Sequence, residues 1–411
     1  MITSLIVTVF LLVYLGMIFG GLPFLQLDRT GIALLGAIAL VASQSMSVDE
    51  TYRSLHAPTL MLLFSFMVIS AQLRLGGFYS WATRRAGMLD IRPSLLLGAI
   101  IAVAAVLSAV FSNDIVCLAM APVLAEICLA RQLQPVPFLL GLSCAANIGS
   151  AATLIGNPQN MLIGQTLDLS FARYMLAASP PVVLCLSATW GLIVASRSRH
   201  GWFSADSSIT PVGANDGQNA PFDLWQTGKG LAVTATLFAS FLFVPWPRDL
   251  MALAGAGLLL SSRNLHSRAM LGLVDWQLLI LFMGLFVVNH AMQQTGLPDR
   301  AVHVLAAHGF DLHAQGILFM ASFVLSNVVS NVPAVMLLLP ATTGEHAGTA
   351  LALSSTLAGN LLIVGSIANI IVVNEAARKG IKIDWREHAR VGVPVSVATL
   401  AITSAYLWMR A

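Results

Sequence analysis

Long apolar stretches, separated by short charged segments, make up most of the chain. A helix needs about 20 predominantly apolar residues to cross a bilayer, and most of the stretches have about this length. We expect membrane spans near residues 3–22, 31–47, 58–74, 137–166, 174–196, 229–247, 249–264, 275–294, 350–374 and 391–409. The pattern therefore predicts an all-α membrane protein with about ten transmembrane helices.

Two further apolar stretches do not fit one straight helix each. The stretch 93–131 carries an acidic residue, Asp114, at its centre, and the stretch 312–344 is too long for a single span. We predict that each folds as a re-entrant hairpin, with one tip at Ser112-Asn113-Asp114 and the other at Ser330-Asn331.

Two of the expected spans contain residues that interrupt helices. One holds Gly156-Asn157-Pro158 and the other holds Gly365-Ser366. Glycine permits close backbone approach, and proline leaves a carbonyl without its helical partner. We therefore predict two broken helices.

The two halves of the chain repeat these features in the same order. Gly98 to Pro122 aligns without a gap with Gly316 to Pro340, and this hairpin alignment pairs the two Ser-Asn tips. The break alignment pairs Gly156 to Asn160 with Gly365 to Asn369 as G-x-x-x-N. Residues 197–228 are rich in Gly, Ser, Pro, Asn and Asp, which is typical of a loop. We predict a first repeat over 1–196, a linker over 197–228 and a second repeat over 229–411.

Positive charge gives the predicted orientation, because cytoplasmic flanks of membrane helices are enriched in Lys and Arg. With the N-terminus outside and both hairpins re-entrant, the outer side receives few of the 21 basic residues, namely Arg53, Arg173, Arg248, Arg300 and Arg410. The linker is then cytoplasmic, and each half has five spans. An odd number of spans makes the two halves run in opposite directions, which is the inverted-topology repeat of secondary transporters.

Composition argues against the soluble alternatives. The 411 residues are 57% hydrophobic and 9% charged, with a net charge of +3, whereas soluble proteins carry roughly 25% charged residues. A soluble enzyme and a nucleic-acid-binding protein are therefore disfavoured. The sequence contains neither an HExxH motif nor a G-x-x-x-x-G-K-[ST] motif. We expect no enzyme, and we expect transport energy to come from an ion gradient, the membrane potential or a separate ATPase subunit.

The candidate site consists of polar and irregular residues at the tips and breaks, because irregular backbone survives at membrane depth only where protein or a water-filled cavity satisfies it. The candidates are Ser112, Asn113, Asp114, Gly156, Asn157, Pro158, Ser330, Asn331, Gly365 and Ser366. Their hydroxyls, amides and free helix ends suit Na⁺ or an oxyanion. The alternative is that such residues only join helices through hydrogen bonds, and Asn147, Thr153 and Asn360 fit both interpretations.

Asp114 is the one acidic residue expected deep in the membrane, where a carboxylate is costly and usually functional. It would hold a coupling Na⁺ or exchange a proton. The alternative is a helix cap at the hairpin tip. We expect no metal site and no cofactor beyond a coupling Na⁺ or H⁺, and we interpret the cysteines as buried apolar residues.

Four segments resemble the ion transporter superfamily. They read FSNDIVCLAMAPVL, NIGSAATLIGNPQNMLIG, SNVVSNVPAVMLLLP and GNLLIVGSIANIIVVNEAARKGIKIDWREHARVGVPV. They are similar in particular to the branch that holds the arsenical-pump membrane proteins (ArsB type) and the NhaD-type and P-protein-like permeases. The divalent-anion:sodium symporters are more distant members.

The resemblance implies a transport domain that moves against a scaffold, often in a homodimer, with ion and substrate sites at the two tips and two breaks. It carries over to the ten candidate residues named above. The sodium symporters have Ser-Asn-Thr at both tips, whereas this chain has Asp114 and Val332 at the third positions. That departure argues against symmetric sodium binding and favours the arsenical-pump side.

We therefore expect a secondary active transporter of an inorganic oxyanion or metalloid in the bacterial inner membrane, with arsenite or antimonite efflux as the leading case. The alternatives are a Na⁺-coupled carboxylate or sulfate permease and a Na⁺/H⁺ antiporter. A channel or a structural membrane subunit fits less well, because inverted hairpins suit alternating access. The expected partners are the lipid bilayer and a small anion or metalloid, and no nucleic acid.

Overall fold

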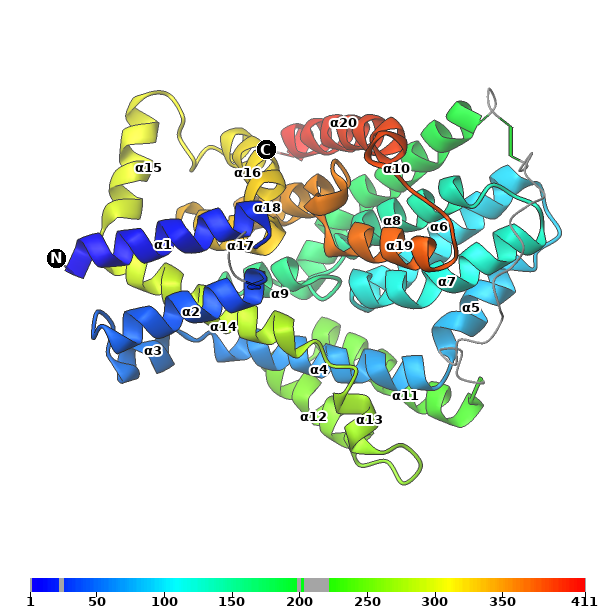
Figure 1. Ribbon diagram of the computed structural model, residues 1–411, viewed down its shortest axis with the longest axis horizontal. Coiled ribbons are helices and arrows are strands. Elements are labelled where there is room, and N and C mark those ends of the chain that lie inside the picture. Colours follow the sequence, from blue (N-terminus) through cyan, green and yellow to red (C-terminus); the bar gives the residue numbers. More distant parts are fainter. Residues whose placement is uncertain (1, 22–25, 198–200, 203–221, 411) are drawn as a thin grey trace.

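The regular elements of the computed structural model are helices (Figure 1). The structure describes residues 2–21, 26–197, 201–202 and 222–410. Within these residues, 7 helices are long and apolar enough to cross a membrane, and several shorter apolar helices accompany them. The predicted all-α membrane class is confirmed.

The first half of the described chain contains ten helices. They are α1 (Ile2–Phe19), α2 (Arg29–Ala42), α3 (Val48–Ser54), α4 (Ala57–Leu75), α5 (Phe78–Gly87), α6 (Pro93–Val110), α7 (Asn113–Ala130), α8 (Pro135–Ser150), α9 (Pro158–Thr166) and α10 (Phe171–Arg197). The second half starts with α11 (Leu224–Phe243), α12 (Arg248–Leu260), α13 (Ser267–Leu271), α14 (Trp276–Gln294) and α15 (Leu297–Ala307). It ends with α16 (Gln315–Val329), α17 (Asn331–Leu338), the 3₁₀ turn η1 (Leu339–Ala341), α18 (Gly344–Ala358), the 3₁₀ turn η2 (Ile363–Gly365), α19 (Ile367–Arg378) and α20 (Trp385–Arg410).

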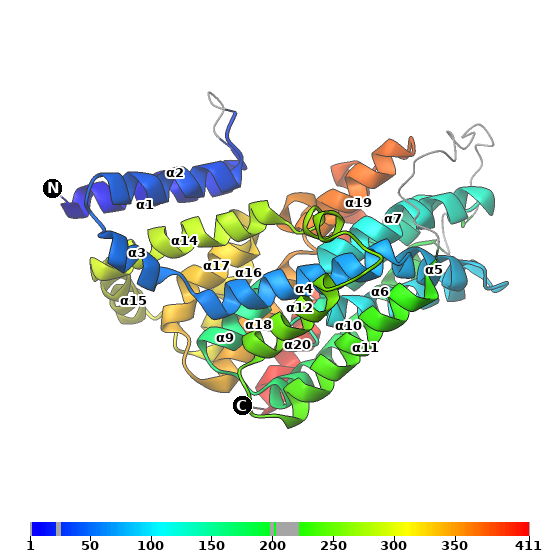
Figure 2. The ribbon, with the colours of Figure 1, turned by 90° about the horizontal axis from the view of Figure 1, so that it is seen from below.

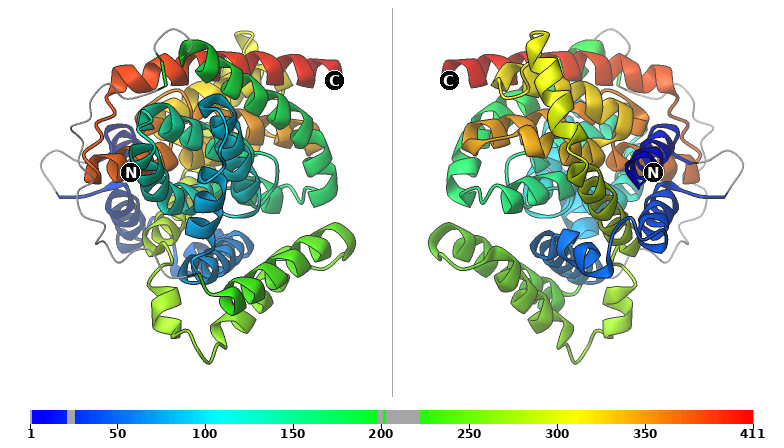
Figure 3. Two further views of the ribbon diagram at one scale, coloured as in Figure 1. Left: turned by 90° about the vertical axis from the view of Figure 1, so that its right-hand side faces the viewer. Right: turned by 90° about the vertical axis from the view of Figure 1, so that its left-hand side faces the viewer.

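The α-helices of the two halves follow the same succession, from α1 and α11 to α10 and α20. The packing repeats as well, since α12 packs along α4 and α2 packs along α14. The paired helices α1 and α2 lie at one edge of the molecule (Figure 2), and α11 and α12 lie at another (Figure 3). The long helix of each half, α4 or α14, therefore packs against a helix of the other half.

Small residues allow the close packing of α2 on α14. A Cβ on Gly284 would lie 2.8 Å from the carbonyl oxygen of Ala33, so only glycine fits there. Close approach of this kind is how helices associate in membranes, where the surrounding lipid is as apolar as the side chains.

The chain turns where the sequence places the hairpin tips and the breaks. Ser112 joins α6 to α7, and Ser330 joins α16 to α17. The expected span 137–166 is the pair α8 and α9, and the span 350–374 falls on α18 and α19. Both α6 and α7 have 18 residues, so each is long enough to cross most of a bilayer, whereas α16 and α17 are shorter.

Four short helices, α3, α5, α13 and α15, were not expected from the sequence. The start of α3 carries a capping box, in which Ser47 and Glu50 satisfy each other's backbone amides, and this S-x-x-E pattern is readable in the sequence. Both α5 and α15 follow a glycine in the left-handed conformation, Gly77 (φ 72°) and Gly296 (φ 68°). These two glycines occupy equivalent positions and turn the chain out of α4 and α14.

The predicted linker 197–228 lies largely outside the described residues, which omit 198–200 and 203–221. Its last part is helical, because Asp223 accepts hydrogen bonds from the amides of Trp225 and Gln226 and so starts α11 at Leu224. The expected loop therefore ends earlier than residue 228. The start of α11 is fixed to the end of α4, where the Gln72 amide donates to the Gln226 side chain at 2.9 Å.

Candidate functional site

The two helix breaks lie in the middle of the molecule, where α7, α8, α18 and α19 come together (Figure 1). Asn157 caps α9, since its Oδ1 accepts from the backbone amide of Asn160 at 2.9 Å. Ser366 stands at the same position before α19, in extended backbone. Both cap residues are at least 95% buried, so their polar atoms need partners within the protein.

Each hairpin tip lies against the break of its own half. In the first half, the backbone amide of Asn113 donates to the carbonyl of Gly156 at 3.3 Å, and the Thr153 hydroxyl donates to the carbonyl of Ala109. In the second half, the Asn331 amide lies beside Gly359, and the Asn327 amide oxygen lies beside Gly365. The structure therefore brings tip and break residues together twice.

Ser330 holds a backbone conformation that L-residues rarely adopt. Its φ is 76° and its ψ is 162°, a region that is essentially reserved for glycine and costs a non-glycine residue about 1–3 kcal/mol. Its counterpart Ser112 has an ordinary φ of −58°. Strain of this kind concentrates at functional sites, where the surrounding structure maintains it.

Ser330→Gly should therefore raise the free energy of unfolding by about 1 kcal/mol, because the relief of strain exceeds the extra chain entropy of glycine. Ser112→Gly is the matched control and should lower it by about 0.5–1 kcal/mol. Thermal unfolding of the purified protein in detergent measures both. Equal shifts in the two variants would show that Ser330 is not strained.

A pair of hydrogen bonds crosses between the halves at the breaks. The Asn157 amide donates to the Thr356 hydroxyl at 3.2 Å, and the Ser366 hydroxyl donates to the Asn147 amide oxygen at 2.9 Å. In the break alignment, Asn157 corresponds to Ser366 and Asn147 corresponds to Thr356. The two hydrogen bonds are therefore equivalent: each joins a cap residue of one half to the same alignment position in the other half.

Asn160 and Asn369 complete the breaks in the same way. The Nδ2 atom of each donates to two carbonyls that the helix break leaves free: Ser150 and Thr153 (3.4 and 3.1 Å) for Asn160, and Gly359 and Leu362 (2.6 and 3.0 Å) for Asn369. The Oδ1 atoms accept across the halves, from Thr356 at 3.3 Å and from Asn147 at 3.1 Å. This is the internal satisfaction of backbone that a break at membrane depth requires.

Asn147 joins the two halves through both ends of its side-chain amide. Its Oδ1 accepts from Asn113 at 3.1 Å and from Ser366 at 2.9 Å. Its Nδ2 lies 3.1 Å from the amide oxygens of both Asn360 and Asn369. One side chain therefore joins the first hairpin tip to the second helix break.

Several buried oxygens beside the tips have no hydrogen-bond partner within the described residues. They are Ser108 Oγ and Asn113 Oδ1 in the first half, and Ser326 Oγ, Asn327 Oδ1 and Asn331 Oδ1 in the second. The hairpin alignment pairs Ser108 with Ser326 and Asn113 with Asn331. Buried polar atoms are nearly always paired, so both places suit an ion or the hydroxyl groups of a solute.

Asp114 is half-buried at the second residue of α7. Among the described residues it forms no salt bridge. Its counterpart in the second half is Val332, which is buried. The two tips therefore differ most at this position.

Several residues of the network are absent from the ten sequence candidates. They are Ser108, Asn147, Asn160, Ser326, Asn327, Thr356, Asn360 and Asn369. Asn160 and Asn369 form the last position of the repeated G-x-x-x-N pattern, so the repeat could have identified them. Asn147 and Asn360 fit both interpretations in the sequence, whereas Thr356 carries no such signal, because its partners lie far away in the sequence.

A family model described as a citrate transporter, CitMHS, matches residues 11–349. The chain belongs to this family. It is therefore a membrane transporter protein of the ion transporter superfamily, as the sequence resemblance implied, and it is an integral membrane protein with bacterial relatives. A second model, described as a protein of unknown function, DUF1646, matches residues 303–409.

Relatives of the chain include members that are named transporters. An uncharacterized transporter of Mycobacterium tuberculosis is 31% identical over 410 residues, which cover 94% of each chain. The silicon efflux transporter LSI3 of Oryza sativa subsp. japonica is 27% identical over 458 residues, covering 94% of this chain and 93% of the relative. A Dictyostelium discoideum transporter named arsB is 21% identical over 496 residues, covering 92% and 87%.

Two solved structures share the fold. The YdaH transporter of Alcanivorax borkumensis, described as having an unusual topology, superposes with a TM-score of 0.56 at 15% identity and covers 100% of this chain and 98% of that chain. MtrF of Neisseria gonorrhoeae, described within a class of antimetabolite efflux pumps, gives 0.59 at 12% identity, with 99% and 94% covered. At these identities the likeness concerns the fold alone.

Proposed function

We propose that the chain is a secondary active transporter built from two inverted repeats, residues 1–196 and 229–411, joined by the cytoplasmic linker 197–228. The equal succession of helices in the two halves supports the repeat, and the crossed hydrogen bonds at the breaks support it independently. In this proposal, ten spans surround two hairpins that enter from opposite sides. The solute then binds between the tips and the breaks.

The proposed solute is a small uncharged hydroxylated metalloid, with arsenite or antimonite efflux as the leading case. The side chains that join the breaks are amides and hydroxyls, the acid Asp114 lies at the first tip, and the His388 ring contacts the carbonyl of Asn360. The described salt bridges use basic residues outside this network. An anion placed there would lack a cationic partner, which is costly in a buried site. Arsenite is fully protonated at neutral pH, so amides and hydroxyls can match its three hydroxyl groups.

The relatives named for silicon efflux and arsB support this solute class, since silicic acid and arsenite are both neutral hydroxides at neutral pH. The family description as a citrate transporter favours the second candidate, a Na⁺-coupled carboxylate permease. The unpaired oxygens beside both tips would then hold Na⁺. A sulfate permease and a Na⁺/H⁺ antiporter belong to the same Na⁺-dependent group.

Flux measurements in proteoliposomes separate these candidates. We expect arsenite and antimonite to move when a pH gradient is imposed, without a requirement for Na⁺, and citrate and sulfate to stay. Movement of citrate that depends on Na⁺, with no arsenite flux, would contradict the metalloid proposal and establish the second candidate.

Asp114 is the proposed coupling group, which binds a proton on one side of the membrane and releases it on the other as the solute moves the opposite way. Asp114→Asn removes the exchangeable proton and keeps the size of the side chain. We expect gradient-driven arsenite accumulation to fall about tenfold, while downhill exchange of arsenite for arsenite continues. Glu345→Gln, which removes an acid from an exposed salt bridge with Arg173, is the control and should keep normal accumulation. Normal arsenite accumulation in the Asp114→Asn variant would contradict the coupling role of Asp114.

A further inference from the structure

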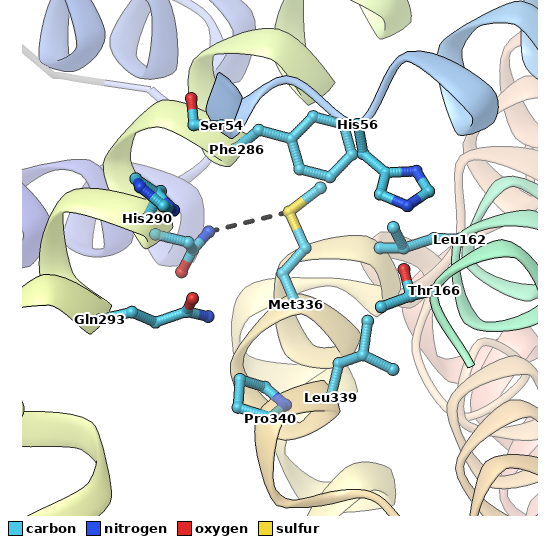
Figure 4. A pocket seen from close by; sticks show the side chains of 11 residues that line it. Ser54, His56, Leu162, Thr166, Phe286, His290, Gln293, Met336, Leu339 and Pro340 are labelled. Atoms are coloured by element: carbon cyan, nitrogen blue, oxygen red, sulfur yellow. Dashed lines mark hydrogen bonds between the residues drawn. The ribbon is translucent and has the colours of Figure 1, made fainter. Parts of the chain in front are cut away.

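A separate cavity of about 300 Å³ lies between α14, α9 and the end of α17, beside the turn from α3 into α4 (Figure 4). Its polar side chains are Ser54, His56, Thr166, Asn289, His290 and Gln293. The remaining wall is apolar and includes Phe286 and Met336. In Figure 4, Met336 points into the centre, with His290 and Gln293 on one side and Leu162 and Thr166 on the other.

The cavity is distinct from the tips and breaks but lies beyond them on the same helices. α9 starts at the first break, and its far end at Thr166 lines the cavity. At 1.5 Å per residue, Thr166 lies roughly 13 Å along the helix from Asn157. α17 starts at the second tip, and its later residue Met336 lines the same cavity. The cavity therefore lies at the end of both helices that lead away from the candidate site.

Within the described part of the chain, the cavity is lined by no Lys, Arg, Asp or Glu. Burial lowers the pKa of the His56 imidazole from its usual value. The His56 Nδ1 atom lies 2.8 Å from the Thr59 hydroxyl and accepts from the Thr59 amide. This cap fixes the ring and leaves Nε2 as a donor.

The remaining polar groups supply both donors and acceptors. Amide side chains such as Gln293 offer both, and so does the hydroxyl of Thr166. The Ser54 hydroxyl donates to the Thr51 carbonyl at 2.7 Å and can still accept. Asn289 is already oriented, because Tyr14 donates to its Oδ1 at 2.9 Å and its Nδ2 donates to the Leu285 carbonyl at 2.8 Å. A solute with several hydroxyl groups can pair with such a lining, whereas an anion would lose its hydration without a cation in return.

On the side of the hairpin, the cavity is lined by α17 and the turn that follows it. Tyr14 and Asn289 are joined firmly between α1 and α14, but they reach α17 only through the Pro333 carbonyl at 3.5 Å and the Met336 sulfur at 3.7 Å. The contact to the carbonyl is at the limit of hydrogen bonding. Hydrogen bonds from Tyr14 and Asn289 therefore contribute little to holding α17 against the wall formed by α14.

We propose that this cavity is a second solute site, a vestibule that binds a small uncharged hydroxylated molecule between the aqueous phase and the helix breaks. The proposal rests on the proposed function for the class of solute. Its volume is at the lower end for ligand pockets, which hold roughly 300–1,000 Å³, so it suits a solute of a few heavy atoms with some water.

Cysteine labelling tests the vestibule without any need for transport. The four native cysteines are all buried, so Gln293→Cys gives a single accessible thiol in the cavity. The probe solute is boric acid, an uncharged trihydroxy molecule that does not bind thiols as arsenite does. We expect boric acid to slow labelling by a membrane-impermeant maleimide at least threefold, and sodium citrate at equal ionic strength to leave the rate unchanged.

Two further variants make the result specific to the cavity. His313→Cys, exposed in the turn before α16, should label at the same rate with and without boric acid. Adding Thr166→Phe to Gln293→Cys fills the cavity and should abolish the protection while labelling continues; Thr236→Phe on the exposed face of α11 should leave the protection intact. Equal labelling of Gln293→Cys with and without boric acid, or equal protection of His313→Cys, overturns the vestibule.

The vestibule and the proposed function can fail separately. If the wild-type protein carries no metalloid in proteoliposomes but boric acid protects Gln293→Cys, the transport proposal fails and the vestibule stands. If metalloid is transported but boric acid gives no protection, the vestibule fails and the transport proposal stands.

Discussion

Asn147→Ala should reduce transport about 30-fold or more while the protein still inserts in the membrane. The side chain joins the first tip, through Asn113, to the second break, through Ser366 and Asn369. Its removal leaves these buried groups without their shared partner. A buried polar group without a partner costs about 1–3 kcal/mol, and each 1.36 kcal/mol in a barrier corresponds to about tenfold in rate.

The loss of stability expected for Asn147→Ala is smaller than the sum of the free energies of its separate hydrogen bonds. Interhelical hydrogen bonds in membranes average about 0.6 kcal/mol, because the unpaired groups find other partners. The break residues, however, are positioned by this network, so disorder at Ser366 and Asn369 changes the site as well as the stability. Flux per folded molecule is therefore the measurement to compare, with the folded fraction taken from size-exclusion chromatography.

Thr189→Val is the control for Asn147→Ala. Thr189 is equally buried, but its hydroxyl bonds within its own helix, to the carbonyl of Cys185 in α10. We expect it to keep at least half of the wild-type flux. If both variants transport equally well, the network only packs helices and does not position the site.

Gly156→Ala should abolish transport and lower the yield of folded protein. A Cβ at this position would lie deep inside van der Waals contact with the Ser150 carbonyl oxygen and 2.8 Å from the Ser108 carbonyl oxygen. Both atoms are backbone, so neither can rotate away. Overpacking costs about 1–3 kcal/mol or more, and here it pushes apart the break and the first hairpin that the site requires.

Gly365→Ala is the matched variant in the second half. The nearest atom to its Cβ is Asn327 Oδ1 at 3.3 Å, which belongs to a side chain that can shift by a few tenths of an ångström. We expect near-normal folding and a flux reduced less than threefold. Thermal unfolding and proteoliposome flux of the two variants measure this difference. Equal stability and equal flux of the two variants would contradict the close approach at Gly156.

The hairpin tips and the breaks are readable in the sequence because they depend on local chemistry. Gly156-Asn157-Pro158 interrupts a helix through its own backbone preferences, and the gapless alignment of the tips shows the same feature twice. The capping box of α3 is equally local, because Ser47 and Glu50 are three residues apart.

The partners of the break residues were beyond the sequence. Thr356 forms hydrogen bonds with Asn157 and Asn160, almost two hundred residues away in the chain. No sequence pattern around Thr356 predicts these two bonds. The difference between the two halves at Gly156 and Gly365 also needs the packed structure, because the two glycines look identical in the repeat.

The sequence by itself determined that this is an all-α membrane protein and where several of its helices are interrupted, since apolar length and helix-breaking residues act locally. It also determined the family. The tertiary structure alone decided which amides meet at the breaks, which oxygens remain unpaired and where the second cavity lies. Those features depend on contacts between distant helices, whose mutual positions follow from packing rather than from any short segment.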